Sequence, residues 1–427
     1  MRDIFKYIVT YIITVEAKML LRRSKPRIIA ITGNVGKTST KDAIYTALKK
    51  THHVRKSQKS YNSEIGVPLS ILGLDNGWNN PWLWLRNIFD GATQVLFHRS
   101  YPEVLVLEAG VDRPGDMKRL ATWLKPDVVV LTRFPDVPVH VEFFGSPEAV
   151  VEEKMQLVHA MHPDGVVFYN QDDERIKAAI ADIPQRVSGY AYTTDADVQA
   201  SAEAVLYEAS RPIGLTFAVQ TKDETVTVEV RGTLGTHSTY TYLAAIAVAQ
   251  EFSVSLAQVI EALHEHQPPP GRMRILAGRN DSIIIDDTYN ASPTATQQAV
   301  ATLTELHAER KIAVLGDMLE IGKHTVAEHE RIGTMLTGID ILITIGVRAR
   351  SIADAAAQAG FTTKNILQFE DVQRAATELQ ARVKPGDVIL IKASQGIRAE
   401  RIVEQLLKDP STAAQQLVRQ SAAWKER

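Results

Sequence analysis

The chain opens with an apolar pattern of helical period. In the first 26 residues apolar side chains recur along one predicted helix face, at Ile4, Tyr7, Ile8, Tyr11, Ile12, Val15 and Met19. Lysines and threonines fall on another side, and a basic run from Arg22 to Arg27 follows. Two interpretations of this amphipathic helix stay open. It packs on the protein or on a second subunit, which we favour, or it lies in a membrane surface as a peripheral contact.

Beyond Pro26, short apolar runs alternate with longer stretches of helical period. The runs RIIAITG, EVLVLEAG and DVVVLTR are apolar almost throughout, as strands buried on both faces of a parallel sheet are. Between residues 186 and 231, GLTFAVQ and ETVTVEVRG alternate apolar and polar positions, which predicts antiparallel strands. We therefore predict an α/β domain with a mostly parallel sheet and a small antiparallel part.

The proline-rich stretch HQPPPGR, residues 266–272, interrupts this pattern, because proline cannot continue a helix. After it the alternation resumes with SIIIDD, KIAVLGD, DILITIG, NILQF and DVILIKAS. We predict three parts: an N-terminal amphipathic helix in residues 1–26, a central domain in 27–268, and a Rossmann-like C-terminal α/β domain in 269–427. For residues 411–427 we expect a terminal helix or partial disorder.

A tryptophan-rich segment, Gly77–Ser100, holds three of the five tryptophans. It lies between two predicted core elements. We favour an amphipathic helix that covers the N-terminal helix. A partner or membrane contact stays open, because tryptophan is common at interfaces.

Composition narrows the class of protein. A chain of 427 residues suits two or three domains. The absence of cysteine excludes disulfides, thiolate metal sites and cysteine nucleophiles, and it fits a reducing compartment such as the cytoplasm. The formal net charge of -2 does not favour nucleic acid as a partner. No secretory signal is evident, because charges interrupt the first apolar segment and no small-residue cleavage site follows.

The stretch ITGNVGKTSTKD, residues 31–42, resembles a phosphate-binding loop, although Ile31 stands where the usual G-x-x-x-x-G-K-[ST] pattern has glycine. A predicted strand ends before it and a predicted helix follows. Gly33 and Gly36 free the backbone, so that N–H groups and the helix N-terminus can bind phosphate. Lys37 would reach the β- and γ-phosphates, and the Thr38 hydroxyl would bind Mg²⁺. We therefore predict a central P-loop-type ATPase domain; a chance glycine turn with an exposed lysine is the alternative.

Two further residues suggest a site at the same edge of the sheet. Glu108 ends the strand EVLVLEAG, where a carboxylate is suited to bind Mg²⁺. Lys154 falls on the apolar side of a predicted helix, with Val150, Val151 and Val158. A solvated lysine does not belong there, which favours a lysine that points into a site and is chemically modified. Snorkelling of its ammonium group to solvent is the alternative.

An ordered series of motifs resembles the Mur ligases of peptidoglycan synthesis, and among them the members that add D-alanyl-D-alanine. It consists of TGNVGKTST, NSEIGVPLSIL, LEAGVDRPGDM, VHVEFFGSPEAVVEEK, PPPGRM, IDDTYNASP, VLGDMLEIG and KASQGIRAERI. The resemblance runs from about Pro26 to about Leu407, and so many ordered motifs are far more specific than the loop alone.

The resemblance implies a ligase reaction. ATP phosphorylates a substrate carboxylate, and an incoming amine attacks the acyl-phosphate to give an amide, ADP and phosphate. The expected partners are a muramoyl-peptide-type carboxylate and an amine such as D-Ala-D-Ala. The expected cofactors are ATP, two Mg²⁺ ions and a carbamate on Lys154. Closure would come from rotation of the last domain about the PPPGR hinge.

The resemblance also implies residue roles. Catalytic roles fall to Lys37, His140 and Lys154. Nucleotide contacts fall to Gly33, Asn34, Gly36, Lys37, Thr38, Ser39, Ser238, Thr241, Arg272, Asp287 and Tyr289. Metal contacts fall to Thr38, Glu108, His140 and Lys154, and substrate contacts to Asn62, Ser63, Asn290, Ser394 and Arg398.

Three features depart from the family pattern. Only about 26 residues precede the phosphate strand, too few for the family's UDP-gripping domain. Ser238 and Thr241 stand where asparagines are usual, and neither hydroxyl offers an amide's paired donor and acceptor. Arg133 replaces another asparagine, which puts a fixed positive charge near the phosphates.

Two rival functions remain open. One is an amino-acid or peptide ligase on a substrate without UDP, as in cyanophycin or polyglutamate synthesis. The other is a non-catalytic nucleotide-binding scaffold that docks through its N-terminal and tryptophan-rich segments. The joint presence of Lys37, Thr38, Glu108, His140 and Lys154 argues against the second, because a decayed site should lose some of them.

Overall fold

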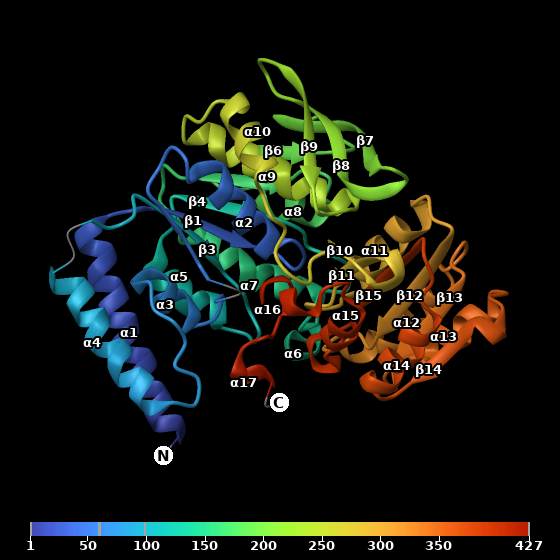
Figure 1. Ribbon diagram of the computed structural model, residues 1–427. Coiled ribbons are helices and arrows are strands. Elements are labelled where there is room, and N and C mark those ends of the chain that lie inside the picture. The colour runs from blue at the N-terminus through green and yellow to red at the C-terminus, as the bar shows by residue number, and fades with distance from the viewer. Residues whose placement is uncertain (1, 59–60, 98–99, 426–427) are drawn as a thin grey trace.

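Two β-sheets organise the protein (Figure 1). The computed structural model describes residues 2–58, 61–97 and 100–425. The first sheet has nine strands and belongs to the central part of the chain, and the second has six strands and belongs to the C-terminal part. This arrangement confirms the predicted α/β class.

The nine-stranded sheet is parallel over most of its width. In spatial order its strands are β2 (Val54–Lys56), β3 (Val104–Glu108), β1 (Arg27–Thr32), β4 (Val128–Leu131), β5 (Val166–Asn170), β6 (Arg186–Ala191), β7 (Val198–Glu208), β8 (Arg211–Gln220) and β9 (Thr225–Arg231). Only β7, β8 and β9 pair antiparallel. The antiparallel part is therefore smaller than the predicted 186–231, because helix α8 (Glu174–Ile180) returns the chain so that β6 pairs parallel to β5.

Helices cover both faces of this sheet. One core lies under α2 (Lys37–Leu48), α9 (Thr236–Glu251) and α10 (Leu256–His264). The other lies under α3 (Gly66–Leu72), α5 (Asp116–Leu124), α7 (Pro147–His159) and α8. The strands β1, β3 and β4 are buried almost completely, which explains why their sequences are apolar nearly throughout.

The six-stranded sheet has one antiparallel edge strand. Its spatial order is β10 (Arg274–Ala277), β11 (Ile283–Asp287), β15 (Asp387–Lys392), β12 (Arg310–Gly316), β13 (Ile341–Ile345) and β14 (Ile366–Phe369). Only β10 pairs antiparallel to its neighbour. Helices α11 (Pro293–Glu305), α12 (Thr325–Gly333) and α13 (Arg350–Gln358) pack on one face, and α14 (Val372–Arg382) and α15 (Glu400–Leu406) on the other.

The two sheets are joined by the proline-rich stretch and share a core. The chain leaves α10 at His264 and enters β10 at Arg274. Leu215 and Leu234 from the central part belong to the same buried apolar cluster as Ile285 and Leu303 from the C-terminal part. The boundary at 268/269 lies within the connection and stays a prediction.

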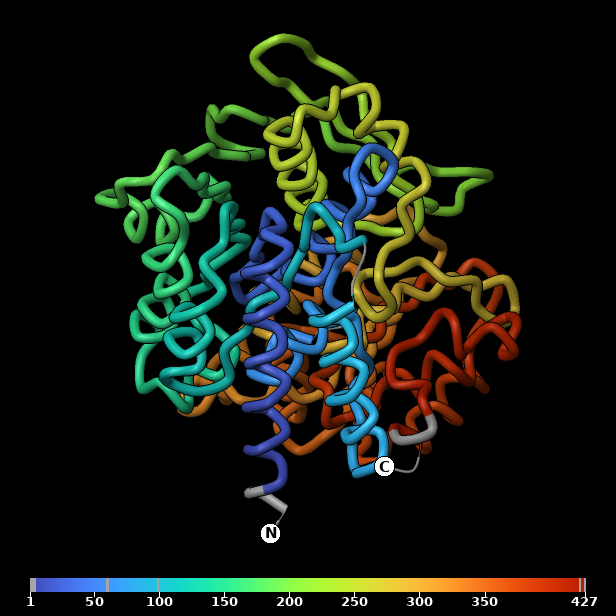
Figure 2. Tube along the Cα trace, turned by 90° about the vertical axis from the view of Figure 1, so that its left-hand side faces the viewer, coloured from blue at the N-terminus to red at the C-terminus, as the bar shows by residue number. Residues whose placement is uncertain are grey.

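Helices α1 (Arg2–Ser24) and α4 (Pro81–Phe97) lie side by side along one flank of the central part (Figures 1 and 2). The tryptophan-rich segment thus forms the predicted helix over the N-terminal helix. The Arg23 guanidinium donates to the Leu96 carbonyl at 2.9 Å and also bonds the Val95 carbonyl, so it satisfies carbonyls at the end of α4.

The predicted buried face of α1 is wrong. The side chains that pack inward are Val9, Ile13, Ala17 and Leu20. Of the predicted stripe, Tyr7, Ile8, Tyr11 and Met19 are exposed, and the side chain of Ile4 lies outside the described residues. The helix carries two apolar faces, and periodicity alone could not tell which one α3 and α4 cover.

None of the described helices combines the length with the apolar character that a helix needs to cross a membrane.

Candidate active site

The loop between β1 and α2 has the geometry of an anion-binding turn. Gly33 has φ 141° and Gly36 has φ 88°, both of which favour glycine. A Cβ on Gly33 would lie 2.0 Å from the Thr132 hydroxyl oxygen, so no side chain fits there. No side chain caps the N-terminus of α2, which leaves its first N–H groups available to an anion. Lys37 Nζ donates to the Gly33 carbonyl at 2.8 Å, so its ammonium lies across the loop.

Glu108 lies behind this loop at the carboxyl end of β3. Its Oε2 accepts a hydrogen bond from the Thr38 hydroxyl at 2.9 Å, and its Oε1 accepts one from the Asn62 amide at 3.1 Å. The carboxylate is 1% exposed. Thr38 and Glu108 thus present adjacent oxygens at the base of the loop, as a divalent cation requires.

Lys154 is buried on α7, as the sequence predicted. The Ser146 hydroxyl accepts from the Ala149 N–H and starts this helix, which directs the lysine inward. Its side chain is 2% exposed, and its ammonium forms no hydrogen bond with a described residue. Burial, followed by the charge of Lys37, holds the pKa of Lys154 well below its usual value. This shift favours the neutral amine, which is the nucleophilic form of the side chain.

His140 lies between two carboxylates from different parts of the chain. It precedes the short helix α6 (Val141–Phe144) in a left-handed conformation, with φ 71°. Its Nδ1 lies 2.8 Å from Glu320 Oε2 and its Nε2 lies 3.5 Å from Asp112 Oδ1. The interaction with His140 lowers the pKa of Glu320. Because Glu320 follows β12, the contact links the two domains.

Arg272 crosses from the proline-rich connection to the loop. Its guanidinium donates to the Thr38 hydroxyl at 3.3 Å and stacks on the Tyr289 ring at 3.9 Å. Its Nε has no hydrogen-bond partner among the described residues. The predicted nucleotide contact Arg272 therefore meets the first turn of α2, and the predicted contact Tyr289 stacks on Arg272.

A cavity of about 830 Å³ lies between the two domains and collects most of the predicted site. Its lining includes Asn34, Lys37, Asn62, Glu108, His140, Lys154, Arg272, Tyr289, Asn290, Ser394 and Arg398. Gly33 belongs to the loop and Thr38 to the first turn of α2, and neither residue lines this cavity. Ser63 is exposed and lines neither this cavity nor the smaller one beside it.

A smaller hollow of about 70 Å³ adjoins the loop on the other side of Arg272. The remaining predicted nucleotide residues line it: Gly36, Ser39, Ser238, Thr241 and Asp287. His237 also lines it, and burial lowers the pKa of His237 to about 4, so this imidazole is neutral. Its Nδ1 has no partner among the described residues and is free for a ligand.

Asp287 and Ser394 form hydrogen bonds with residues that were not predicted to belong to the site. Lys392 Nζ donates to Asp287 Oδ2 at 2.5 Å, and both side chains are buried. The Ser394 hydroxyl accepts from the Leu319 N–H at 2.9 Å and is 2% exposed, so it holds two loops together. A lysine at the end of the apolar run DVILIKAS was a signal that could have revealed Lys392.

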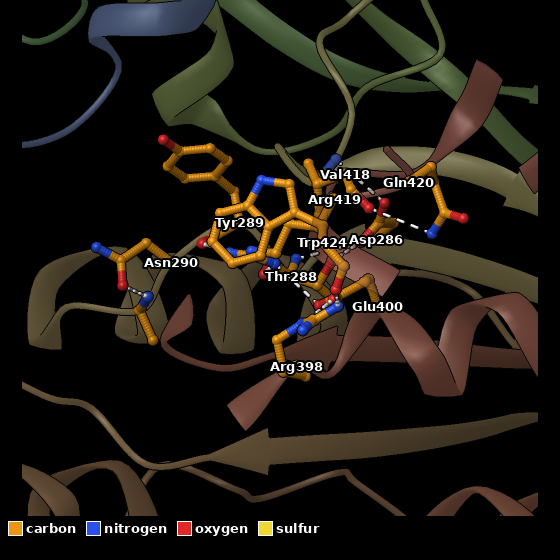
Figure 3. A network of polar contacts seen from close by, with 12 residues as sticks. Asp286, Thr288, Tyr289, Asn290, Arg398, Glu400, Val418, Arg419, Gln420 and Trp424 are labelled. Atoms are coloured by element: carbon orange, nitrogen blue, oxygen red, sulfur yellow. Dashed lines mark hydrogen bonds and ion pairs between the residues drawn. The ribbon is translucent and has the colours of Figure 1, made fainter. Parts of the chain in front are cut away.

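The C-terminal tail returns to the cavity, in contrast to a simple terminal helix. Arg398 Nε donates to Glu400 at 2.6 Å, and Arg419 donates to the other oxygen of Glu400 at 2.9 Å. The Arg398 guanidinium lies 5.4 Å from the Trp424 ring. Figure 3 shows Tyr289, Trp424 and Arg398 converging at this place. Arg419 and Trp424 could not be predicted as site residues, because the local pattern of a polar tail does not indicate a tertiary contact.

Arg133 does not reach the large cavity. It lines a separate hollow with Asp172 and Asp173, while its backbone carbonyl accepts from the Asn34 N–H at 2.8 Å. The charge that replaces the usual asparagine therefore lies behind the loop. Within the described ranges 2–58, 61–97 and 100–425, no cluster of three or more histidine, aspartate or glutamate side chains is arranged to hold a metal by itself.

Two protein-family models match this chain. A model described as the Mur ligase middle domain matches residues 85–249. A model described as the Mur ligase, glutamate ligase domain matches residues 271–395. The first match lies within the central part of the chain and the second within the C-terminal part.

Two relatives that share one name align along most of the chain. The chain is 31% identical over 411 residues to the UDP-N-acetylmuramoyl-tripeptide–D-alanyl-D-alanine ligase of Mycobacterium leprae, with 90% of this chain and 74% of that protein covered. It is 27% identical over 397 residues to the Bacillus subtilis enzyme of that name, with 92% and 79% covered. The MurF ligase of Thermotoga maritima, solved in complex with ADP, matches with a TM-score of 0.76 at 26% identity, covering 93% of this chain and 83% of that chain.

Proposed function

Because the chain belongs to the Mur ligase family, we propose that it is an ATP-dependent, ADP-forming amide ligase of peptidoglycan precursor synthesis. Its acceptor is a muramoyl-peptide-type carboxylate, and its amine is D-alanyl-D-alanine or a close analogue. Relatives named for this reaction align along most of the chain, which supports the assignment.

One observation carries the proposal. The cavity between the domains gathers Lys37, Glu108, His140 and Lys154 from the central part and Arg272 from the connection to the C-terminal part. Cations for phosphate, oxygens for a divalent metal and a reactive amine thus line one space. A non-catalytic scaffold has no need for this combination.

ATP fits the loop and the smaller hollow. The uncapped N-terminus of α2 and Lys37 provide the phosphate end. The unpartnered His237 Nδ1 and Arg272 Nε provide donors or acceptors for the rest of the nucleotide. Thr241 and Ser238 line the same hollow, although the Ser238 hydroxyl already donates to the Leu234 carbonyl at 2.9 Å.

Magnesium fits the oxygens of Thr38 and Glu108, which lie 2.9 Å apart at the base of the loop. A bound Mg²⁺ ion would neutralise phosphate charge during transfer. His140 would contribute to a second ion only after release from Glu320, since its Nδ1 lies 2.8 Å from that carboxylate. In the proposed cycle Glu320 holds the imidazole until substrates bind.

Lys154 fits the role of a carbamylated lysine. Its lowered pKa provides a neutral amine, whose lone pair attacks the carbon of CO₂. The nitrogen then loses a proton, which leaves a carbamate anion and no net oxidation. Carbamylation converts a buried, unpartnered amine into an oxygen-bearing anion near Lys37 that is suited to Mg²⁺.

The chain's residues would then perform two displacements. Lys37 and Arg272 stabilise charge while a carboxylate oxygen of the acceptor attacks the γ-phosphorus and ADP leaves. The amine nitrogen next attacks the acyl carbon of the acyl-phosphate, phosphate leaves, and the amide forms after loss of a proton. Asn62, Asn290 and Arg398 line the cavity where the two substrates would meet.

A substrate panel scored by phosphate release tests the function. We expect release only when ATP, a muramoyl-peptide acceptor and D-alanyl-D-alanine are all present. Each acceptor should be offered with and without its UDP group. Release with free amino acids and none with muramoyl peptides would instead indicate a ligase of the polyglutamate type. No release with any acceptor would remove the catalytic assignment.

A further inference from the structure

Helices α1 and α4 present an uncovered apolar face. On α1 the outward side chains include Tyr7, Ile8, Tyr11 and Met19. On α4 they follow a helical spacing of three, four and seven residues, at Trp82, Leu85, Phe89 and Leu96. Trp82, Phe89 and Tyr7 are 79%, 72% and 73% exposed, so these rings are almost fully in solvent.

The face is concentrated on these helices. Within the described part of the chain, eleven of the sixteen exposed large hydrophobic side chains lie on α1 and α4. Scattered exposed apolar residues are normal, whereas a concentration of this kind marks a binding surface. The active-site cavity is lined by other elements, so the catalytic reaction does not account for the face.

The two helices present this face as one unit. They run parallel, because Glu16 meets Gly91 and Arg23 meets Val95 and Leu96. A Cβ on Gly91 would lie 2.1 Å from Glu16 Oε2, so glycine permits the close approach. Figure 2 shows both helices side by side on the side turned toward the viewer. Their outward side chains can therefore contact one flat partner.

Charge around the face is mainly positive. Among the described side chains of the two helices and of the residue that follows α1, the cations are Lys6, Lys18, Arg22, Arg23, Lys25 and Arg86. Among the described side chains there, Glu16 points inward and Asp90 pairs with Arg86 at 3.3 Å. The whole chain has a net charge of -2, so positive charge is gathered here against the overall sign.

We propose that the outer face of α1 and α4 docks on the surface of an anionic lipid membrane. Both helices lie in the interface, with aromatic rings at the headgroup level and cations on the phosphates. A second copy of the chain is a poorer occupant. A two-fold pairing through one face brings the same cations toward each other, whereas anionic headgroups neutralise them. The surface goes beyond the proposed function and does not depend on it.

Vesicle flotation tests this surface. We expect the full chain to float with vesicles of phosphatidylcholine and phosphatidylglycerol, and less with phosphatidylcholine alone. A Trp82→Glu/Phe89→Glu variant should bind at least about tenfold more weakly, since each ring loses a favourable burial. The matched control Val326→Glu/Val347→Glu, at two exposed apolar positions of the C-terminal part, should float as the natural chain does.

A second variant separates charge from apolar contact. Arg22→Gln/Lys25→Gln should lose affinity for phosphatidylglycerol vesicles and part of its dependence on salt. Every variant should keep the circular-dichroism spectrum and the thermal unfolding midpoint of the natural chain, which shows that the fold is intact. A natural chain that fails to float, or a Trp82→Glu/Phe89→Glu variant that floats equally, overturns the proposal. So does a dimer that this variant abolishes in the absence of vesicle binding.

Discussion

At the cavity, Lys154 and Glu108 are buried charged groups, whereas on α1 and α4 Trp82 and Phe89 are exposed aromatic groups. Both placements cost free energy in an isolated chain, because water solvates the charges and avoids the rings. For Glu108 the cost is offset locally, since the carboxylate accepts hydrogen bonds from Thr38 and Asn62. On the helices nothing in the described chain offsets it. The cavity is therefore suited to small ligands, whereas the exposed apolar face of the two helices is suited to a large surface.

The largest effect should come from Lys154. We expect Lys154→Ala to lower the rate of phosphate release by about 1000-fold, because the anion that it would carry is lost from the cavity. Lys154→Arg should fail equally, since a guanidinium does not form the carbamate. Lys118→Ala, at an exposed lysine, is the control.

The modification itself can be followed without turnover. Protein treated with isotopically labelled bicarbonate should show a carbamate carbon resonance that Lys154→Ala lacks. Full activity of Lys154→Ala, or the same resonance in both proteins, would contradict the carbamate assignment.

The next effect should come from Arg272, which spans the loop and Tyr289. We expect Arg272→Ala to lower kcat/KM for ATP by about 100-fold, because a phosphate-facing guanidinium and its stacking contact are both lost. Arg279→Ala, at an exposed arginine of the same domain, should change it little. Equal losses in both variants would show that general charge, and no specific contact, sets the affinity.

A smaller effect should come from Glu16, the buried carboxyl between α1 and α4. Burial raises the pKa of Glu16 to about 7, and its Oε2 has no partner among the described residues. Between about pH 4.5 and 7 the folded state retains a proton that the unfolded state releases, so stability falls as pH rises. Glu16→Gln should remove this slope and raise the free energy of unfolding above pH 7 by about 1 to 3 kcal/mol.

Chemical denaturation at several pH values measures that slope. Glu208→Gln, at an exposed position on β7, is the matched control and should leave it unchanged. An unchanged slope in Glu16→Gln would mean that the carboxyl ionises in the folded protein without cost.

The smallest effect should separate the two faces of α1. Ile13→Val removes a methylene from a fully buried side chain and should cost about 1 kcal/mol of stability. Ile8→Val, on the exposed face, should stay within about 0.5 kcal/mol. Equal costs at both positions would show that Ile8 is covered in solution, for example by a second copy.

Much of the fold could be predicted because parallel strands buried on both faces read as apolar runs. RIIAITG and EVLVLEAG became β1 and β3, and their shared carboxyl edge placed Glu108 beside the loop. Lys154 could be predicted from helical period, which placed it on the buried side of its helix. The inward face of α1 could not be chosen, because both of its faces are apolar.

Side-chain contacts between segments that are distant in the sequence could not be predicted. Glu320 meets His140 and Lys392 meets Asp287 only after two sheets are packed together. Arg419 and Trp424 lie in a polar tail whose course depends on tertiary contacts with Glu400 and Arg398. Local pattern holds no information on such pairs.

The position of Trp424 also provides an optical probe. Its ring meets Trp78 of the central part at 6.1 Å and Arg398 of the C-terminal part at 5.4 Å. Any rotation that parts the domains must change the surroundings of this indole. Its fluorescence emission, isolated by replacing the other tryptophans with phenylalanine, would therefore report opening and closing in real time, with no added dye.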